Sequence, residues 1–123
     1  MLIRASEKER YPKNWPEIRA RILRRAQHRC EACGVPNRAW IYREVNGRWY
    51  YVGKRSLIDA GYGRPPFTIG IYDEGRRVVV KVIEIVLTVA HLDHTPENCA
   101  DDNLKALCQY HHLEYDRTQH RIS

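Results

Sequence analysis

Two pairs of metal-ligating residues, far apart in the chain, constrain the fold more than any other feature of the sequence. Cys30 and Cys33 are separated by two residues in the sequence CEACG, and Cys108 and His111 show the same spacing near the end of the chain. Each short loop can bring two donors to about 2.1–2.3 Å from one ion, and tetrahedral Zn²⁺ requires four such donors. The sequence therefore predicts one structural zinc site.

The segment between the two pairs is 74 residues long, far longer than in compact zinc fingers. It must leave the zinc site and return to it, so we expect an inserted sheet. In a chain of 123 residues the core is modest, and structural zinc contributes about 10–16 kcal/mol of apparent binding energy in finger peptides. Zinc binding is therefore expected to be decisive for folding.

Other interpretations of the cysteines are a redox-active CxxC or a pair of buried structural thiols. A redox pair is expected at a helix N-terminus in a βαβ unit, whereas Cys30 follows a predicted helix and a second ligand pair exists, so zinc is favoured. Cys99 lies outside both pairs, in a polar loop, and is predicted to be a free thiol.

The N-terminal sequence MLIRASEKER is charged where a signal peptide is apolar. The longest apolar stretch, Val78 to Ala90, is interrupted by polar residues and shorter than the roughly 20 residues of a membrane helix. We therefore expect a cytoplasmic protein without membrane association.

The positive charge is concentrated at one end of the chain. Residues 1–30 hold nine Lys and Arg against three acids, while residues 31–123 hold twelve of each. Such a balance favours a polyanionic partner, and double-stranded DNA is expected. The predicted DNA-binding residues are Arg19, Arg21, Arg24, Arg25 and Arg29. The alternative interpretation is that these arginines serve only to keep the protein soluble. DNA is then expected to contact Arg43, Arg48 and Lys54 instead.

The basic residues fall on a predicted helix over residues 14–29, which is expected to end near His28. Asn14 is a possible N-cap, and Glu17 three residues later suggests a capping box. An apolar stripe at helical spacing is expected to face the core: Ile18, Ile22, Leu23 and Ala26.

The pattern becomes strand-like from Trp40, and β-hairpins are expected over residues 40–84. Asn46-Gly47 predicts a two-residue turn with positive φ at both positions. Residues 67–72 are expected to pair with the chain from Arg77 onward, and residues 78–90 to continue as one long strand or two shorter ones. Residues 90–103 then form a loop, and residues 109–117 a short helix.

The last 35 residues are rich in groups that bind metals or transfer protons. Besides the zinc ligand His111, they include His91, Asp93, His94, Asn103, His112, Asp116 and His120. His112 and Asp116 are four residues apart, so they lie on one face of a helix and can share a second cation. His120, like His28, is expected to be structural.

The sequences VAHL and NLKALCQYHH, with CEACG upstream, resemble the HNH endonucleases of the ββα-metal superfamily. The resemblance covers residues 11–34 and 85–120. It implies a zinc-stapled, treble-clef-like ββα-metal core at residues 85–117 with the zinc-binding segments 30–33 and 108–111, and it leaves the middle sheet unmatched. The length of the chain is that of one domain, so we expect a single α+β domain over residues 1–123 that also contains the N-terminal basic helix and the inserted antiparallel sheet.

The resemblance also implies residue roles. Leu107-Cys108 matches the family's second ligand pair, in which His111 replaces the last Cys, and His112 falls on the motif's final His as ligand of a catalytic cation. His91 is then the general base, and Asn103 orients it.

This chain departs from the family at Ala90, where a metal ligand usually precedes the base. The favoured interpretation keeps His91 as base with Asp93 as an extra metal ligand; in the alternative, His94 is the base. Asp116 is a further candidate ligand.

The expected activity is cleavage or nicking of double-stranded DNA by hydrolysis of phosphodiester bonds, with Mg²⁺, Mn²⁺ or another divalent cation. A neutral imidazole with a pKa near 6.5 can take the proton of the attacking water. The main alternative is a zinc-stabilised nucleic-acid-binding module without catalytic activity. A redox or metal-storage protein leaves the arginines and Asn103 unexplained.

Overall fold

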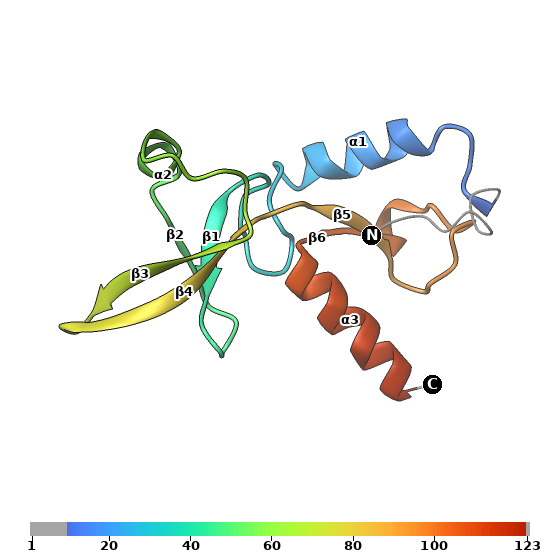
Figure 1. Cartoon of the computed structure of the whole chain (residues 1–123). Coiled ribbons are helices and arrows are strands. Elements are labelled where there is room, and N and C mark those ends of the chain that lie inside the picture. The colour runs from blue at the N-terminus through green and yellow to red at the C-terminus, as the bar shows by residue number, and fades with distance from the viewer. Residues whose placement is uncertain (1–9, 123) are drawn as a thin grey trace. The chain divides into compact units, whose positions relative to one another are not determined.

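The computed structural model describes the backbone of residues 10–122 and the side chains up to Arg117. The chain divides into two compact units (Figure 1). The terminal unit contains the described residues up to Asn37 and from Val86 onward, and the inserted unit is Arg38–Ile85. Both combine helices with antiparallel strands, so the α+β class predicted from the sequence is confirmed. No helix in the described part of the chain has the length and apolar composition of a membrane span.

Helix α1 (Trp15–Arg25) opens the terminal unit with Pro16 in its first turn, where a missing N–H costs nothing. It buries Ile18, Ile22 and Leu23, as the apolar stripe predicts. The prediction of a capping box is wrong, because the Asn14 side chain forms no cap hydrogen bond. The helix also ends before His28, since Gln27 and His28 adopt left-handed backbone angles with φ of 57° and 56°.

The rest of the terminal unit is a hairpin followed by a helix. Strand β5 (Thr88–His91) pairs with β6 (Leu104–Leu107) in an antiparallel ladder that sets His91 opposite Leu104. Between them lies the 3₁₀ turn η2 (Asp101–Asn103), and helix α3 (Gln109–Ile122) follows. The residue pattern did not predict β6, because four residues are too few to show an alternation, and α3 is longer than the expected 109–117.

The inserted unit is a four-stranded antiparallel sheet with the order β2-β1-β4-β3, as expected for the middle of the chain. Its elements are β1 (Trp40–Arg43), β2 (Trp49–Tyr51), α2 (Lys54–Asp59), β3 (Phe67–Asp73) and β4 (Arg76–Glu84). The short helix α2 was not predicted. The apolar stretch from Val78 contains two strands, β4 and β5, which belong to different sheets.

The two hairpin turns of this sheet differ. Asp73 pairs with Arg76 across Glu74 and Gly75, both with positive φ, so the second hairpin has the expected position. The first turn is longer than predicted, because the Glu44 amide donates to the Arg48 carbonyl at 2.8 Å and leaves three residues in the loop. In this loop only Gly47 has a positive φ, so the prediction of a positive φ at Asn46 is wrong.

Candidate functional site

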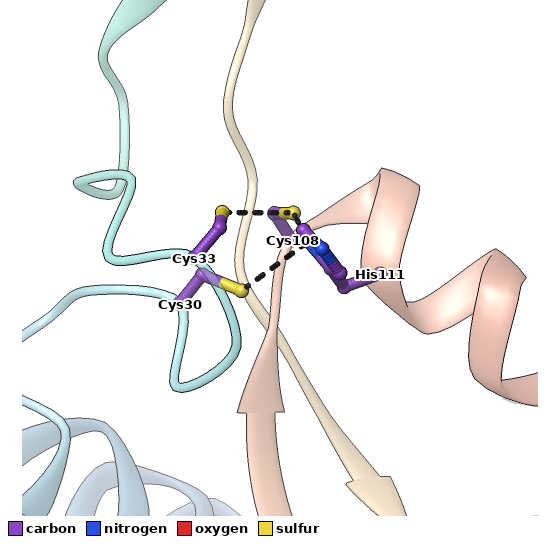
Figure 2. Close-up of side chains that lie close together, drawn as sticks. All are labelled: Cys30, Cys33, Cys108 and His111. Atoms are coloured by element: carbon purple, nitrogen blue, oxygen red, sulfur yellow. Dashed lines mark hydrogen bonds between the residues drawn. The ribbon is translucent and has the colours of Figure 1, made fainter. Parts of the chain in front are cut away.

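The first ligand pair lies in a tight turn directly after α1. The Cys30 amide donates to the Val35 carbonyl at 2.9 Å, and the Gly34 amide donates to the Cys30 carbonyl at 2.8 Å. Gly34 has a φ of 78°, a left-handed conformation that glycine adopts without strain. This turn directs the Cys30 and Cys33 side chains toward the second pair, which stands at the start of α3 (Figure 2).

The four ligand atoms form a compact group. Cys33 Sγ lies 4.0 Å from Cys108 Sγ, and His111 Nδ1 lies 3.3 Å from Cys108 Sγ and 3.9 Å from Cys30 Sγ (Figure 2). Metal bonds of 2.3 Å to sulfur and 2.0–2.1 Å to nitrogen at tetrahedral angles predict separations of about 3.6–3.8 Å. The Cys₃His cluster therefore fits a structural zinc ion.

The electrostatics of the cluster also suit a cation. The contact with Cys108 lowers the pKa of Cys30 to about 4, and the same contact with the Cys30 thiolate, together with burial, raises the pKa of Cys108. Two neighbouring thiols thus compete for ionisation, because the first thiolate opposes the second. A divalent cation removes this competition, since it binds every sulfur as thiolate.

A second group of polar side chains lies where α3 meets β5. His112 is buried, and its Nδ1 is 2.6 Å from Thr88 Oγ1, whose hydroxyl donates to the Leu107 carbonyl. The direction of the hydrogen bond between His112 and Thr88 depends on the tautomer of His112, and His112 Nε2 lies 3.6 Å from Asp116 Oδ2. The predicted placement of His112 and Asp116 on one helix face is confirmed.

His94 joins this group through the other carboxylate oxygen. Its Nε2 lies 3.0 Å from Asp116 Oδ1, and its ring stacks on Tyr115 at a centroid distance of 5.5 Å. An open depression of about 310 Å³ borders the group, lined by Thr88, Gln109, His112, Leu113 and Asp116. Burial lowers the pKa of His112, although the Asp116 charge opposes the shift.

His91 occupies a separate, aromatic environment at the end of β5. Its ring stacks on Trp15 at 5.0 Å and meets the Tyr11 ring edge-on at 5.5 Å. Its Nε2 lies 3.6 Å from Cys99 Sγ, and that thiol donates to the Pro96 carbonyl. Burial lowers the pKa of His91, which favours the neutral imidazole. Sequence reasoning missed the Cys99 contact, because nothing in the spacing of residues 91 and 99 indicates it.

The Asp93 carboxylate, a predicted metal ligand, is surrounded by hydrogen-bond donors. Its carboxylate accepts hydrogen bonds at 2.9 Å from the Thr95 amide and from the side-chain amides of Asn98 and Asn103. The two side-chain amides, with the Thr95 amide, lower the pKa of Asp93 to about 2. These contacts make Asp93 the centre of the β5–β6 connection, and the structure groups His94 rather than Asp93 with His112 and Asp116.

Asn103 contacts the same loop. Its side chain donates to the Asn98 carbonyl at 2.8 Å and accepts from the Asp93 amide at 3.2 Å, while its carbonyl accepts from the Leu92 amide. Asn103 therefore holds the backbone that follows His91.

The arginines of the N-terminal segment are largely engaged within the terminal unit. Arg19 and Arg29 donate to backbone carbonyls, and Arg21 forms an ion pair with Asp101 at 2.7 Å. Arg25 donates to the carbonyls of Asp101 and Leu104 and pairs with Glu31. Arg24 is exposed, and its side chain forms no hydrogen bond or ion pair with the part of the chain that the structure describes.

The contrast between Arg24 and Arg25 yields a prediction. Arg25→Gln removes charge-assisted hydrogen bonds that join α1 to β6. We therefore expect the free energy of unfolding to fall by about 1–2 kcal/mol, a value that allows for the partial exposure of the Arg25 side chain. Arg24→Gln is expected to leave stability unchanged. If the protein binds DNA as the sequence predicts, Arg24→Gln should also weaken binding to all sequences alike and lower the slope of log affinity against log salt concentration by about 0.9. Chemical denaturation and salt-dependent binding measure the two effects, and equal stability of both variants would contradict the assignment.

Comparison of the chain with models of protein families, with curated proteins and with solved structures finds no match.

Proposed function

We propose that the protein is a metal-dependent endonuclease that hydrolyses phosphodiester bonds of double-stranded DNA. The observation that carries the proposal is the orientation of His112, whose Nδ1 is held by Thr88 and whose Nε2 faces the Asp116 carboxylate. In the proposed tautomer the Nδ1–H donates to Thr88 and Nε2 directs a lone pair at the carboxylate, and two such acceptors repel unless a positive charge lies between them. The pair is therefore proposed as the binding site of a catalytic divalent cation.

The geometry of the pair suits such an ion. Neighbouring ligands about 2.1 Å from one metal are about 3.0–3.4 Å apart at octahedral or tetrahedral angles. The observed 3.6 Å between His112 Nε2 and Asp116 Oδ2 needs only a small adjustment. Metal-binding histidines generally donate their other ring N–H to an acceptor, and Thr88 Oγ1, 2.6 Å from His112 Nδ1, is in the position of such an acceptor.

In this proposal His94 positions a metal ligand. Its Nε2–H donates to Asp116 Oδ1, which orients the other carboxylate oxygen toward the cation. With His94 engaged in this way, His91 is the proposed general base. Its burial keeps the imidazole neutral at physiological pH, and its position at the end of β5 is maintained by the loop that Asn103 and Asp93 hold together.

The order of the elements supports the same proposal. His91 ends the first strand of a hairpin, the helix that follows carries His112, and the zinc ligand His111 immediately precedes His112. This is the strand–strand–helix order implied by the resemblance to HNH endonucleases. A zinc ion at Cys30, Cys33, Cys108 and His111 would fix the start of α3, and with it the direction of the His112 side chain.

The chemistry that follows from these roles is simple. His91 takes a proton from a water molecule aligned with the scissile P–O bond, and the 3′-oxygen leaves as the new bond to phosphorus forms. A divalent cation, when bound, supplies positive charge to the phosphate and to the leaving oxygen. His94 and Thr88 hold the two ligands in place.

A nucleic-acid-binding module without catalysis is the second candidate. Ala90 stands where the family usually has a ligand, and His91 is buried against Trp15 rather than open to solvent. Both features favour a protein that has kept the zinc-stabilised fold and lost cleavage.

Incubation of supercoiled plasmid with the zinc-loaded protein and Mg²⁺, Mn²⁺ or Ni²⁺ separates the two candidates. The proposal predicts nicked or linear product with at least one of these ions, and a loss of roughly 100-fold or more in rate for His112→Ala. Glu114→Gln, on the same helix, is the matched control and should cleave normally. Intact plasmid with all three ions would favour the binding module.

A further inference from the structure

One face of the sheet in the inserted unit combines aromatic and basic side chains. Residues paired across antiparallel strands share a face, and alternate residues along a strand do too. Arg43 pairs with Trp49, Ile41 with Tyr51, Ile41 with Ile83, and Tyr72 with Arg77. The register therefore defines one face, called here the basic aromatic face: Trp49, Tyr51, Tyr72, Arg77 and Lys81. Arg43 shares this register, but its Nη1 donates to the Gly47 carbonyl at 2.7 Å and its Nε is buried.

The two tyrosines of this face are open to solvent, while Trp49 is half-buried. Tyr72 is 78% exposed and Tyr51 is 59% exposed, and Val79 between them in the register is 64% exposed. Trp49 meets Tyr51 edge-on at a centroid distance of 5.0 Å. Exposed aromatic rings gathered on one sheet face are unusual for a surface without a partner.

The charge of the face is also one-sided. It carries two exposed cations, Arg77 and Lys81, and no acidic residue, because the acidic strand residues Asp73 and Glu84 pair with Arg76 and Trp40 on the opposite face. Gly70 makes room for one of these cations, since a Cβ at this position would lie 2.8 Å from Arg77 Nη2. The Arg77 guanidinium therefore lies over the sheet at Gly70 rather than away from it.

We propose that the basic aromatic face binds single-stranded nucleic acid. Unpaired bases stack on exposed aromatic rings, and cations between the rings contact the phosphates. A duplex offers its phosphates but keeps its bases stacked inside, so it would leave Tyr51 and Tyr72 unused. The proposal stands independently of the proposed cleavage activity, because it concerns residues of the other unit.

The test measures fluorescence anisotropy of a labelled 20-nucleotide oligothymidylate with the full-length, zinc-loaded protein and no added divalent cation. Tyr72→Ala is expected to weaken binding about tenfold. Arg77→Gln is expected to lower the slope of log affinity against log salt concentration by about 0.7, the value for one phosphate contact on a single strand. Arg76→Gln, the neighbouring residue on the opposite face, is the matched control and should bind as the parent does. Thermal melts check that the exposed substitutions leave the fold intact.

Wild-type affinity and salt slope in both Tyr72→Ala and Arg77→Gln would overturn the proposal. Equal losses of affinity for the oligothymidylate and for a duplex of the same length would overturn it too, since they indicate a general electrostatic surface. Plasmid cleavage reports separately on the terminal unit: weakened oligothymidylate binding without any cleavage by the parent protein supports this inference while rejecting the nuclease.

Discussion

Cys108→Ser is expected to abolish zinc binding and most of the circular dichroism signal of the folded protein. Cys108 is fully buried at the junction of β6 and α3, and its sulfur lies within 4.0 Å of Cys33 Sγ and 3.3 Å of His111 Nδ1. The apparent binding energy of structural zinc, about 10–16 kcal/mol in finger peptides, is comparable to the whole stability of a small domain. Metal analysis and circular dichroism of the purified variant measure both losses.

Cys99→Ser provides the control for this prediction. Cys99 is half-buried and lies outside the Cys₃His cluster, so the variant should keep one zinc ion and its fold. Zinc retained at full occupancy in the Cys108 variant, or absent from the parent protein, would refute the assignment of the site.

His91→Ala is expected to reduce cleavage by about 10²–10⁴-fold while leaving zinc content and DNA affinity near those of the parent. A general base acts in the chemical step and contributes little to ground-state binding. The rate requires the unprotonated imidazole, so it should rise with pH through the pKa of His91. Because burial lowers that pKa, the parent should stay active below the usual histidine value of about 6.5.

Two substitutions of His94 separate its role from that of His91. Gln places a nitrogen donor near the position of the imidazole Nε2, so His94→Gln should keep the bond to Asp116 and most of the activity. His94→Ala should raise the divalent cation concentration needed for half-maximal rate about tenfold, with a maximal rate near that of the parent. Normal cleavage by His91→Ala together with inactive His94→Gln would instead identify His94 as the base.

The local patterns of the sequence predicted the elements that depend on near neighbours. The i, i+4 stripe of α1 and the turn residues Glu74-Gly75 determine a buried helix face and a hairpin through contacts a few residues long. The ligand spacing predicted the Cys₃His cluster, because each pair is a local loop and only their meeting is long-range. The Asn46-Gly47 turn shows the limit of such local patterns. The same two residues also fit a three-residue loop, which is the loop that the structure contains.

Only the tertiary structure decided which of several neighbouring candidate side chains takes which role. Arg24 and Arg25 are equivalent in sequence, yet Arg25 alone reaches carbonyls 76 and 79 residues further along the chain. Asp93 and His94 are both potential ligands, but amides from residues 98 and 103 occupy Asp93, while a left-handed backbone at His94 accompanies its contact with Asp116. Hydrogen bonds between distant segments depend on how the chain packs, and short-range spacing carries no information about that packing. The sequence by itself therefore determined which chemical groups are present, while packing determined which of them meet.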